Sequence, residues 1–485
     1  MKEKFYITTP IYYASGAPHI GHAFTTIFAD VISRYKRLKN FDVFFLTGMD
    51  EHGAKIAELA KKTPQEFVDE LAEKYIGLWK ALEIENNDFI RTTSQRHKNG
   101  VLNFFEKLKE SGDIYEGFYE GLYCVGCEDF ILERNLVNGL CPDHLKKPEL
   151  IKEKNYFFNL KKYLPVIKEK IEKNKIKIIP ESRKNEALNI LSGDLPDFSI
   201  TREKVKWGIP YPFDKNQIIY VWVEALLNYI TALDFSIDFS SGEKLKKYWP
   251  ADVHIIGAEI NKFHTIFWPA LLMSVNLPLP KKIFIHGLFT INGQKMSKTL
   301  GNIIDPEKLA EKFGADAVRY FLISQFPASE HGDIKEGGFV EKYNSDLANG
   351  IGNLFERTFT MALKYGADFK SIDEEVKKNS DEIIKKYEFH MENFELYESL
   401  REVFILAKFL DRYLNDKNPW TLYKNNPSNQ EISKILNSVV FGIETIIKML
   451  NPFMPEKMKN AEIFLNKLKN KEIKDGDKLN LFPRV

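Results

Sequence analysis

Hydrophobic and polar positions in the N-terminal part of the chain alternate between a pattern typical of buried strands and one typical of an amphipathic helix. Residues 4–13, KFYITTPIYY, predict a strand that ends at a turn containing Gly16 and Pro18. The helix-periodic segment AFTTIFADVISRYKRL follows, and then DVFFLTGMDEHG, a continuous apolar run typical of a buried parallel strand. Strand, helix and strand in this order predict a doubly wound α/β sheet, whose ligands bind beyond the carboxyl ends of its strands.

The remainder of the chain divides according to the same patterns. Short, turn-rich pieces from about 113 to 200 predict an insertion. Strand-like runs return in QIIYVWVEAL, DVHIIGAEI and KKIFIHGLFTING, so we expect the sheet to continue there, and beyond about 340 the pattern is almost entirely helical. We therefore predict a Rossmann-type domain in two halves (1–112 and 201–290), the insertion (113–200), a linking region (291–340) and an all-α C-terminal bundle (341–485).

The motif APHIGHAF places His19 and His22 on either side of Gly21, where the first strand passes into the helix. One interpretation is a metal site completed by Asp50 or His52, which we expect at the same edge of the sheet, and another is a pair of ordinary surface or core histidines. We favour anion binding. The glycine allows the backbone to approach a ligand, and the first turn of a helix offers N–H groups and the positive end of its dipole. Imidazoles there can also donate hydrogen bonds to phosphate oxygens.

All three cysteines of the chain fall in CVGCEDFILERNLVNGLCPDH. Cys124 and Cys127 are separated by two residues, and so are Cys141 and His144. Two such pairs supply three thiolates and one imidazole, which suits tetrahedral Zn²⁺. Three buried, unligated cysteines are the alternative, although chance would scatter them along the chain. Since four protein ligands leave no open position, we expect this zinc to be structural.

A second candidate for phosphate binding, GQKMSKTLGN, follows the strand-like run IFIHGLFT. It carries Lys295, Ser297 and Lys298 between two glycines. On its own, such a lysine pair is more often a solvated loop. After a strand of the sheet, however, it can cover a triphosphate and neutralise the charge that develops as pyrophosphate departs.

The two motifs together resemble the HIGH and KMSKS signatures of class I aminoacyl-tRNA synthetases. Essentially the whole chain is similar to the methionyl-tRNA synthetase family, in the segments PIYYASGAPHIGHAFTTIFADVISRY, GMDEHG, YVWVEALLNYI, NKFHTIFWPA, NGQKMSKTLGNIIDP, NPW and LFPR. The resemblance implies that the methionine carboxylate attacks the α-phosphate of ATP, which enters with Mg²⁺, to give methionyl-adenylate and pyrophosphate. The terminal ribose hydroxyl of tRNA(Met), including the initiator, then takes the methionyl group. Positioning and stabilisation of phosphate charge would carry most of this chemistry.

The resemblance also implies residue roles, position by position. It implies that ATP is bound by His19, Gly21, His22, Gly257, Glu259, Lys295, Ser297 and Lys298, and that His19, His22, Lys295 and Lys298 are catalytic. It implies a methionine pocket of Ile11, Tyr13, Asp50, Trp222, Ala225, Leu226, Tyr229, Ile260 and His264, in which Asp50 holds the ammonium group. The C-terminal bundle becomes an anticodon-binding domain, in which Asn353, Arg357 and Trp420 match positions that bind the CAU anticodon.

The chain departs from the family pattern at two places. The second signature ends in Thr299 instead of serine, which keeps a hydroxyl group. The usual Gly-Lys-Asp before the pocket helix is Gly257-Ala258-Glu259 here, so Glu259 stands where an aspartate near the ATP ribose is expected. Arg202, in SITREKVKWGIP, resembles a family arginine near the active site.

Two rival hypotheses remain. One is a sister synthetase for isoleucine, valine, leucine or cysteine, although the interval from His19 to Lys295 is short for the large editing insertion of the branched-chain enzymes. The other is a non-catalytic RNA-binding protein with a zinc knuckle, which would need neither nucleotide signature.

Composition adds little to these hypotheses. The net charge of +1 does not by itself indicate a nucleic-acid partner, but the charge of a local groove matters more than the total charge. No apolar run approaches the roughly 20 residues that span a bilayer, and the N-terminus lacks a signal core. We therefore expect a cytoplasmic protein without a membrane partner. The chain ends just after LFPR, without the appended domain that dimerises some family members, so we expect a monomer.

Overall fold

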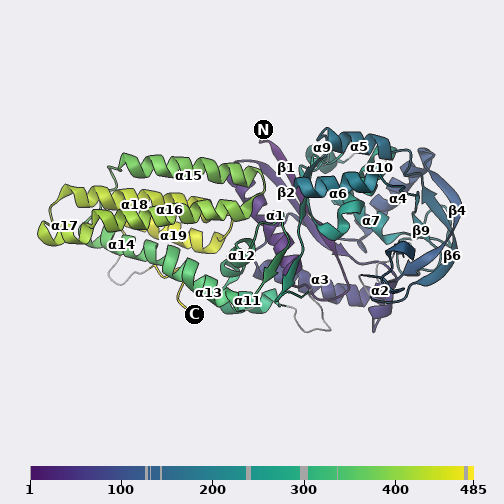
Figure 1. Ribbon diagram of the computed structural model, residues 1–485, viewed down its shortest axis with the longest axis horizontal. Helices are drawn as coiled ribbons and strands as arrows, with labels where there is room; N and C mark the ends of the chain where they lie inside the picture. Colours follow the sequence, from purple (N-terminus) through teal and green to yellow (C-terminus); the bar gives the residue numbers. More distant parts are fainter. Residues whose placement is uncertain are drawn as a thin grey trace. The chain divides into compact units, whose positions relative to one another are not determined.

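The computed structural model describes residues 2–125, 129–131, 133–142, 145–235, 242–294, 304–335, 337–473 and 479–485. It forms two compact units (Figure 1). The first consists of Met1–Pro18, Lys36–Lys80 and Ile84–His286, and the second of His19–Tyr35, Ala81–Glu83 and Gly287–Val485. Among the helices of the described residues, none has the length and apolar character needed to cross a bilayer.

A parallel sheet of six strands forms the centre of the first unit, in the order β3-β2-β1-β11-β12-β7. The strands are β1 (Lys4–Tyr13), β2 (Asp42–Asp50), β3 (Asp88–Arg91), β7 (Lys177–Ile179), β11 (Val253–Gly257) and β12 (Lys282–His286). β2 and β11 are buried along almost their whole length, as expected when both faces of a sheet are covered. The predicted doubly wound sheet is confirmed. Its strand order reverses between β1 and β11, which is where ligands bind in such folds.

Helices and short helical turns surround this sheet. They are α2 (Ala54–Leu59), α3 (Pro64–Ala81), α4 (Gln95–Glu110), α5 (Leu164–Glu172), α6 (Glu181–Leu191), α7 (Val221–Leu226), α8 (Asn228–Thr231), α9 (Glu243–Tyr248), η2 (Ala258–Ile260), η3 (Phe263–Phe267) and α10 (Trp268–Ser274). One continuous apolar cluster runs from β1 and β2 through α4 to α10, and Phe104, Phe105 and Trp268 are fully buried in it.

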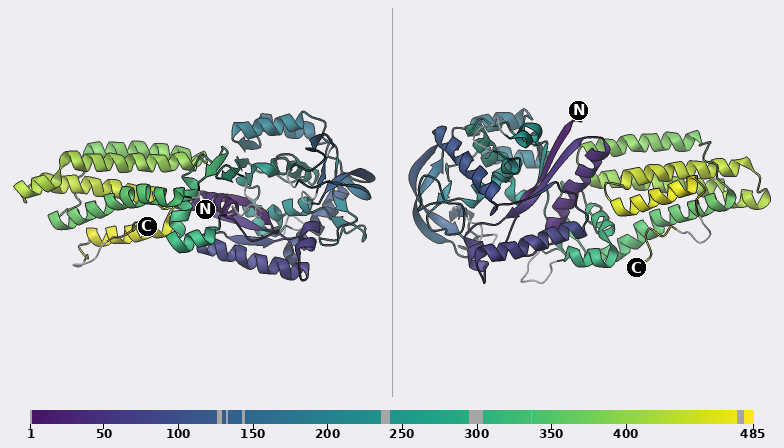
Figure 2. Two further views of the ribbon diagram at one scale, coloured as in Figure 1. Left: turned by 60° about the horizontal axis from the view of Figure 1, so that its bottom comes forward. Right: turned by 180° about the vertical axis from the view of Figure 1, so that it is seen from behind.

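The predicted insertion contains longer strands than its turn-rich sequence suggested. β4 (Ile114–Cys124) and β6 (Glu149–Phe158) have 11 and 10 residues and pair antiparallel over nearly their full length (Figure 2). β5 (Asp129–Ile131) and β8 (Phe198–Ser199) complete this four-stranded sheet, with the turn η1 (Glu133–Asn135) beside them. Gly117 and Gly121 interrupt the alternation of side chains in β4, which explains why the strand was hidden in the sequence.

The prediction of a sheet strand at QIIYVWVEAL is wrong. Only Ile218–Ile219 is extended; this strand, β10, pairs antiparallel with β9 (Thr201–Arg202) outside the parallel sheet. The chain then turns into α7 and α8, whose residues are almost all buried. A short helix whose residues are almost all buried cannot be distinguished from a buried strand by periodicity. DVHIIGAEI does supply β11. KKIFIHGLFTING supplies β12 of the parallel sheet and then β13 (Phe289–Ile291), which belongs to the second unit.

The second unit is mostly helical, as predicted. It contains most of α1 (Ile20–Leu38), the paired strands β13 and β14 (Gly332–Ile334), α11 (Pro306–Phe313), α12 (Ala315–Ile323), α13 (Gly338–Lys342), η4 (Tyr343–Gly352), α14 (Asn353–Tyr365), α15 (Glu374–Glu392), α16 (Leu396–Lys417), α17 (Pro419–Asn425), α18 (Gln430–Leu450) and α19 (Pro455–Lys469). The long helices α15, α16 and α18 run side by side in every view (Figures 1 and 2). Buried residues recur along one face of α16, which gives the bundle its core.

Candidate active site

The two histidines of the first motif lie at the N-terminus of α1, as predicted. The backbone N–H of His19 donates to Nδ1 of His22, and the N–H of Gly21 donates to Nδ1 of His19, both over 3.1 Å. The two rings are stacked, with centroids 3.8 Å apart. Because each Nδ1 accepts a hydrogen bond, the proton of each neutral imidazole is on Nε2. Each Nε2 is therefore a donor, as phosphate binding requires.

The alternative metal site at these histidines gains no support from their neighbours in the sequence. His52 pairs with Glu224, and the Nδ1 atoms of His19 and His22 are engaged by backbone N–H groups. Within the part of the chain that the structure describes, no three or more His, Cys, Asp or Glu side chains are grouped as metal ligands.

Several of the residues predicted to bind methionine converge in the first unit. Nδ1 of His264 lies 3.0 Å from the carbonyl oxygen of Ile260, so Nδ1 donates and Nε2 must accept. The Tyr229 hydroxyl donates to that Nε2 over 2.7 Å. Burial lowers the pKa of the His264 imidazole to about 4 and raises the pKa of the Tyr229 phenol, so both groups are neutral at pH 7.

Aromatic and aliphatic side chains adjoin this hydrogen-bonded pair. Trp222 of α7 stacks on Phe263, next to His264, with ring centroids 4.1 Å apart. Ala225 and Leu226, on the same short helix, are buried. A neutral, largely apolar lining of this kind suits an uncharged thioether, which is polarisable and packs well against aromatic rings.

The ends of β1 and β2 carry Ile11, Tyr13 and Asp50. Tyr13 is paired in register with Asp50, and Ile11 with Gly48. A side chain on Gly48 would meet the carbonyl oxygen of Ile90 at 2.1 Å, so only glycine allows the strands to approach here. Asp50 is buried and its backbone carbonyl accepts from Ala14, which fixes the carboxylate at the carboxyl end of the sheet.

Gly257 and Glu259 lie at the carboxyl end of β11, beside the point where the strand order reverses. A Cβ atom on Gly257 would be 2.5 Å from Oε2 of Glu259, so the longer carboxylate folds back over this glycine. Glu259 is exposed, and it is therefore available to a ligand at this edge.

Arg202 is buried in β9 and donates to the carbonyl oxygen of Thr201 over 2.9 Å. Its guanidinium lies 3.7 Å from the centre of the Tyr220 ring, and Tyr220 directly precedes α7. Arg202 also lines a small hollow with His52, Gly53, Ala54, Tyr123, Val205, Trp207, Ile219, Tyr220 and Val221. The structure thus connects Arg202 to the helix that carries Trp222.

The second signature itself, with Lys295, Ser297, Lys298 and Thr299, lies outside the described residues. The structure does describe the segment of the chain that leads into this signature. The carboxylate of Asp333 accepts from the Thr290 hydroxyl over 2.6 Å and from the N–H of Gly293 over 2.7 Å, and these hydrogen bonds lower its pKa. Asn292 and Gly293 both have positive φ, so they form the turn that leaves β13. Asp333 was not predicted, because it comes about 40 residues later in the chain than Gly293.

Of the predicted zinc ligands, Cys124 and Cys141 are described and buried, whereas Cys127 and His144 lie outside the described residues. Cys124 ends β4 and pairs with Asp129, so the first two-residue spacing coincides with the connection between β4 and β5. The N–H of Cys141 donates to the carbonyl of Lys146, and its carbonyl accepts from the N–H of Leu145.

The predicted anticodon residues come together in the second unit. Asn353 and Arg357 are one turn apart on α14, and Trp420 is in the first turn of α17, directly after Pro419. The Arg357 guanidinium lies 4.6 Å from the centre of the Trp420 ring. Arg357 has two further partners on α16 that were not predicted, Asn415 at 2.8 Å and Asp411 at 3.5 Å.

These features define a class I tRNA synthetase, and comparison with known families agrees. The family model for "tRNA synthetases class I (M)" matches residues 5–147 and 144–359. The model for the "Anticodon-binding domain of tRNA ligase" matches residues 373–460.

Individual relatives identify the family within this class. Methionine–tRNA ligase of Thermotoga maritima is 45% identical over 475 residues, which cover 95% of this chain and 75% of the relative. The ligase of Caldanaerobacter subterraneus is 43% identical over 469 residues, covering 95% and 73%. Methionyl-tRNA synthetase of Mycobacterium tuberculosis in complex with methionyl-adenylate superposes with a TM-score of 0.92 at 33% identity, over 99% of this chain and 100% of that one. The chain therefore belongs to the methionyl-tRNA synthetase family, which the sequence predicted.

Proposed function

We propose that the chain performs the two steps of methionine–tRNA ligation with the residues described above. As a member of its family the chain is a methionine–tRNA ligase, which binds ATP, methionine and tRNA. The observation that carries the residue-level proposal is the neutral Tyr229–His264 pair beside Trp222. Burial keeps His264 unprotonated and outweighs the hydrogen bond to Ile260, which acts in the opposite direction on its pKa, so the pocket presents no positive charge to the sulfur of methionine.

In this proposal methionine binds with its thioether among Trp222, Ala225, Leu226, Tyr229 and His264, with Ile11, Tyr13 and Ile260 completing the pocket. Its ammonium group pairs with the buried carboxylate of Asp50. A buried carboxylate that receives a cation recovers its desolvation cost, which favours the amino acid over uncharged thioethers.

ATP binds against the N-terminus of α1. The Nε2 protons of His19 and His22 donate to phosphate oxygens and Gly21 allows the backbone to approach them, while Gly257 and Glu259 bind the nucleoside end. Lys295, Ser297 and Lys298 cover the phosphates and stabilise the charge that moves onto pyrophosphate. Mg²⁺ bound to ATP supplies further neutralisation of the phosphates. The protein contributes position and fixed dipoles, since attack by a carboxylate needs no covalent help.

The test is ATP–pyrophosphate exchange with the full chain. We expect exchange to depend on methionine, with isoleucine, valine, leucine and cysteine giving a small fraction of that rate. Charging of CAU-anticodon tRNA should follow. Exchange that responds to another of these amino acids better than to methionine would contradict the proposal.

We also propose a structural zinc ion held by Cys124, Cys127, Cys141 and His144. The support is that Cys124 and Cys141 are buried, each at a chain reversal closed by backbone hydrogen bonds. Two pairs of ligands, each separated by two residues, supply three thiolates and one imidazole, which suits a tetrahedral zinc ion. When bound, Zn²⁺ would cross-link the two turns and contribute folding energy to the insertion.

The oligomeric state and location complete the proposal. We propose a monomer in the cytoplasm. Light scattering at micromolar concentration should give the mass of one chain, and a stable dimer would contradict this.

A further inference from the structure

A buried contact between a histidine and a carboxylate connects the end of β2 to α7 in the first unit. Nδ1 of His52 lies 2.6 Å from Oε1 of Glu224, and the two side chains are 2% and 0% exposed. Removing two such groups from water is costly, so a buried pair is weak evidence for stability alone. The pair therefore points to a role other than stability.

Each partner leads directly to one side of the methionine pocket. His52 follows Asp50 by two residues at the carboxyl end of β2. Glu224 lies on α7 between Trp222 and Leu226. The pair therefore connects the segment that is proposed to hold the ammonium group to the helix that is proposed to hold the side chain of methionine.

α7 depends on such contacts for its position. It has six residues, and a helix of this length is not stable by itself because nucleation is costly. Its N-terminus follows Tyr220, and its C-terminus turns at once into α8. Trp222 and Leu226 are consequently placed by whatever fixes α7 to the sheet.

The other end of the pair is rigidly held. The indole N–H of Trp207 donates to the carbonyl of Glu51 over 2.6 Å, and the N–H of Gly53 donates to the carbonyl of Trp207 over 3.0 Å. The rings of His52 and Trp207 are in edge contact, with centroids 5.3 Å apart. Residues on both sides of His52 are thus fixed, which makes His52 a firm anchor for Glu224.

Glu224 has little else to hold it. Burial raises the pKa of its carboxyl group, and His52 acts in the opposite direction. Its second oxygen, Oε2, has no hydrogen-bond partner among the described residues. His52 is accordingly the one strong polar contact that orients this side chain within the part of the chain that is described.

We propose that His52 and Glu224 are positioning residues for methionine: their contact sets the distance between Asp50 and the apolar wall formed by Trp222, Ala225 and Leu226. This inference rests on the proposed function. Loss of either partner lets α7 shift and weakens methionine binding, while the ATP-binding signature on α1 keeps its own contacts.

The experiment measures KM for methionine and for ATP in pyrophosphate exchange, with the parent chain, His52→Ala, Glu224→Ala and Glu224→Gln. We expect KM for methionine to rise about tenfold in both alanine variants and KM for ATP to change less than about twofold, because a lost buried contact of this kind is worth roughly one power of ten. Glu224→Gln keeps an acceptor for His52 and should remain close to the parent. The double alanine variant should be no worse than the single variants, since both remove the same contact.

A matched control is Asp113→Asn. Asp113 is also a buried carboxylate of the first unit, but its partners are Lys162, Tyr163 and Ser274, none of which is a proposed pocket residue. This variant should lose stability without a selective change in KM for methionine. If Glu224→Ala does not fold, His52→Gln gives the same comparison with a smaller change in volume.

Two results would overturn the inference: unchanged methionine KM in the folded variants, or equal increases for methionine and ATP together with a lower melting temperature. The second result would mean that the pair is only structural. Failure of the proposed function is distinguishable, because the parent chain itself would then show no methionine-dependent exchange.

Discussion

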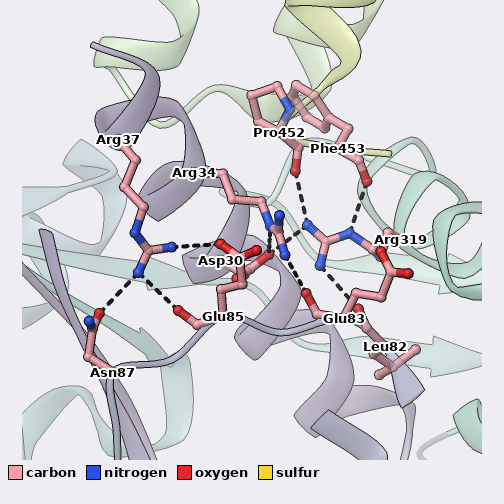
Figure 3. A network of polar contacts seen from close by, with 10 residues as sticks. All are labelled: Asp30, Arg34, Arg37, Leu82, Glu83, Glu85, Asn87, Arg319, Pro452 and Phe453. Carbon is pink, nitrogen blue, oxygen red and sulfur yellow. Dashed lines mark hydrogen bonds and ion pairs between the residues drawn. The ribbon is translucent and has the colours of Figure 1, made fainter. Parts of the chain in front are cut away.

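Arg319 of α12 donates to the carboxylate of Asp30 in α1 over 2.7 Å, and both side chains are fully buried (Figure 3). The same guanidinium donates to the carbonyl oxygens of Leu82, Pro452 and Phe453. Since Pro452 and Phe453 lie in the turn between α18 and α19, this single side chain fastens α1, whose N-terminus carries His19 and His22, to the helical bundle of the second unit. Each nitrogen of the guanidinium has a partner, as a buried charge requires.

Arg319→Met should therefore destabilise the second unit severely. The change leaves Asp30 and three carbonyl groups buried without this donor, although Arg34 continues to pair with Asp30. Removing one partner of a buried pair costs about 3–5 kcal/mol. Urea unfolding followed by circular dichroism measures the loss.

Arg37→Met is the matched control for this change. Arg37 is also drawn in Figure 3, but it bonds to Glu85 and Asn87 at the surface of the first unit. Exposed pairs are worth about 0–1 kcal/mol, so this variant should unfold near the parent midpoint. Equal effects of the two substitutions would contradict the role of burial.

Asp316, one turn before Arg319, should make stability depend on pH. Its Oδ2 accepts from the backbone N–H of Lys457 over 2.6 Å, and burial raises its pKa to about 7. Because the folded pKa lies above the unfolded value near 3.8, the folded chain holds this proton more tightly. The contribution of this carboxyl group to the free energy of unfolding is complete below about pH 4 and is lost as the pH rises through about 7.

Asp316→Asn should remove this dependence while its side-chain oxygen still accepts from Lys457. We expect the free energy of unfolding of the variant to rise steadily relative to that of the parent from pH 4 to pH 7. The difference should reach up to roughly 4 kcal/mol, which is the shift of the Asp316 pKa converted at 1.36 kcal/mol per pH unit. Melting temperatures at several pH values measure the difference. Parallel curves for the two proteins would show that Asp316 does not titrate in this range.

Much of this architecture was predictable because it is encoded locally. The strands β1 and β2 and the helix α1 follow from continuous apolar runs and a clear 3.6-residue period, and Pro419 predicts the start of α17. α7 was misassigned because its residues apart from Glu224 are all apolar, so they show no periodicity that separates helix from strand. The partners Asp333, Asn415 and Glu224 were not predicted, since each meets its counterpart across 40 or more residues and only the folded chain brings them together.

His22→Ala should slow pyrophosphate exchange by about 3–4 kcal/mol in activation free energy and leave methionine affinity nearly unchanged. The reason is that a donor aimed at a phosphate acts mainly on charge that develops in the transition state. Single-turnover exchange and equilibrium methionine binding separate the two effects. A comparable loss of methionine affinity would contradict phosphate binding, and metal lost from this variant would revive the metal hypothesis.

Cys141→Ser should lower zinc content and destabilise the sheet of β4, β5, β6 and β8. Cys141 is fully buried in a closed turn, and binding energy at a structural zinc site is largely folding energy. Elemental analysis and limited proteolysis of the insertion measure the two effects. Unchanged zinc stoichiometry would exclude Cys141 as a ligand.

Trp420→Ala should weaken the use of tRNA without affecting methionine activation. The Trp420 ring is half-buried, with the Arg357 guanidinium over it at 4.6 Å and Asn353 exposed one turn away on α14. An unpaired anticodon base can stack on such a surface and bond along its edge to the arginine and the amide. Stacking is worth roughly 1–3 kcal/mol per base, so kcat/KM for tRNA should fall by that amount.

Trp420→Phe is the conservative comparison for this last change, because it keeps an aromatic face and should recover part of the loss. Charging of CAU and altered-anticodon transcripts by each variant measures discrimination, and exchange with methionine and ATP serves as the internal reference. Because Arg357 also binds Asp411 and Asn415, it should stay in place when the indole is removed, so the loss reports the missing aromatic face and not a displaced arginine. If Trp420→Ala preserved the parent's preference for CAU, or if exchange fell as much as charging, Trp420 would be a core residue of α17 and not part of the anticodon site.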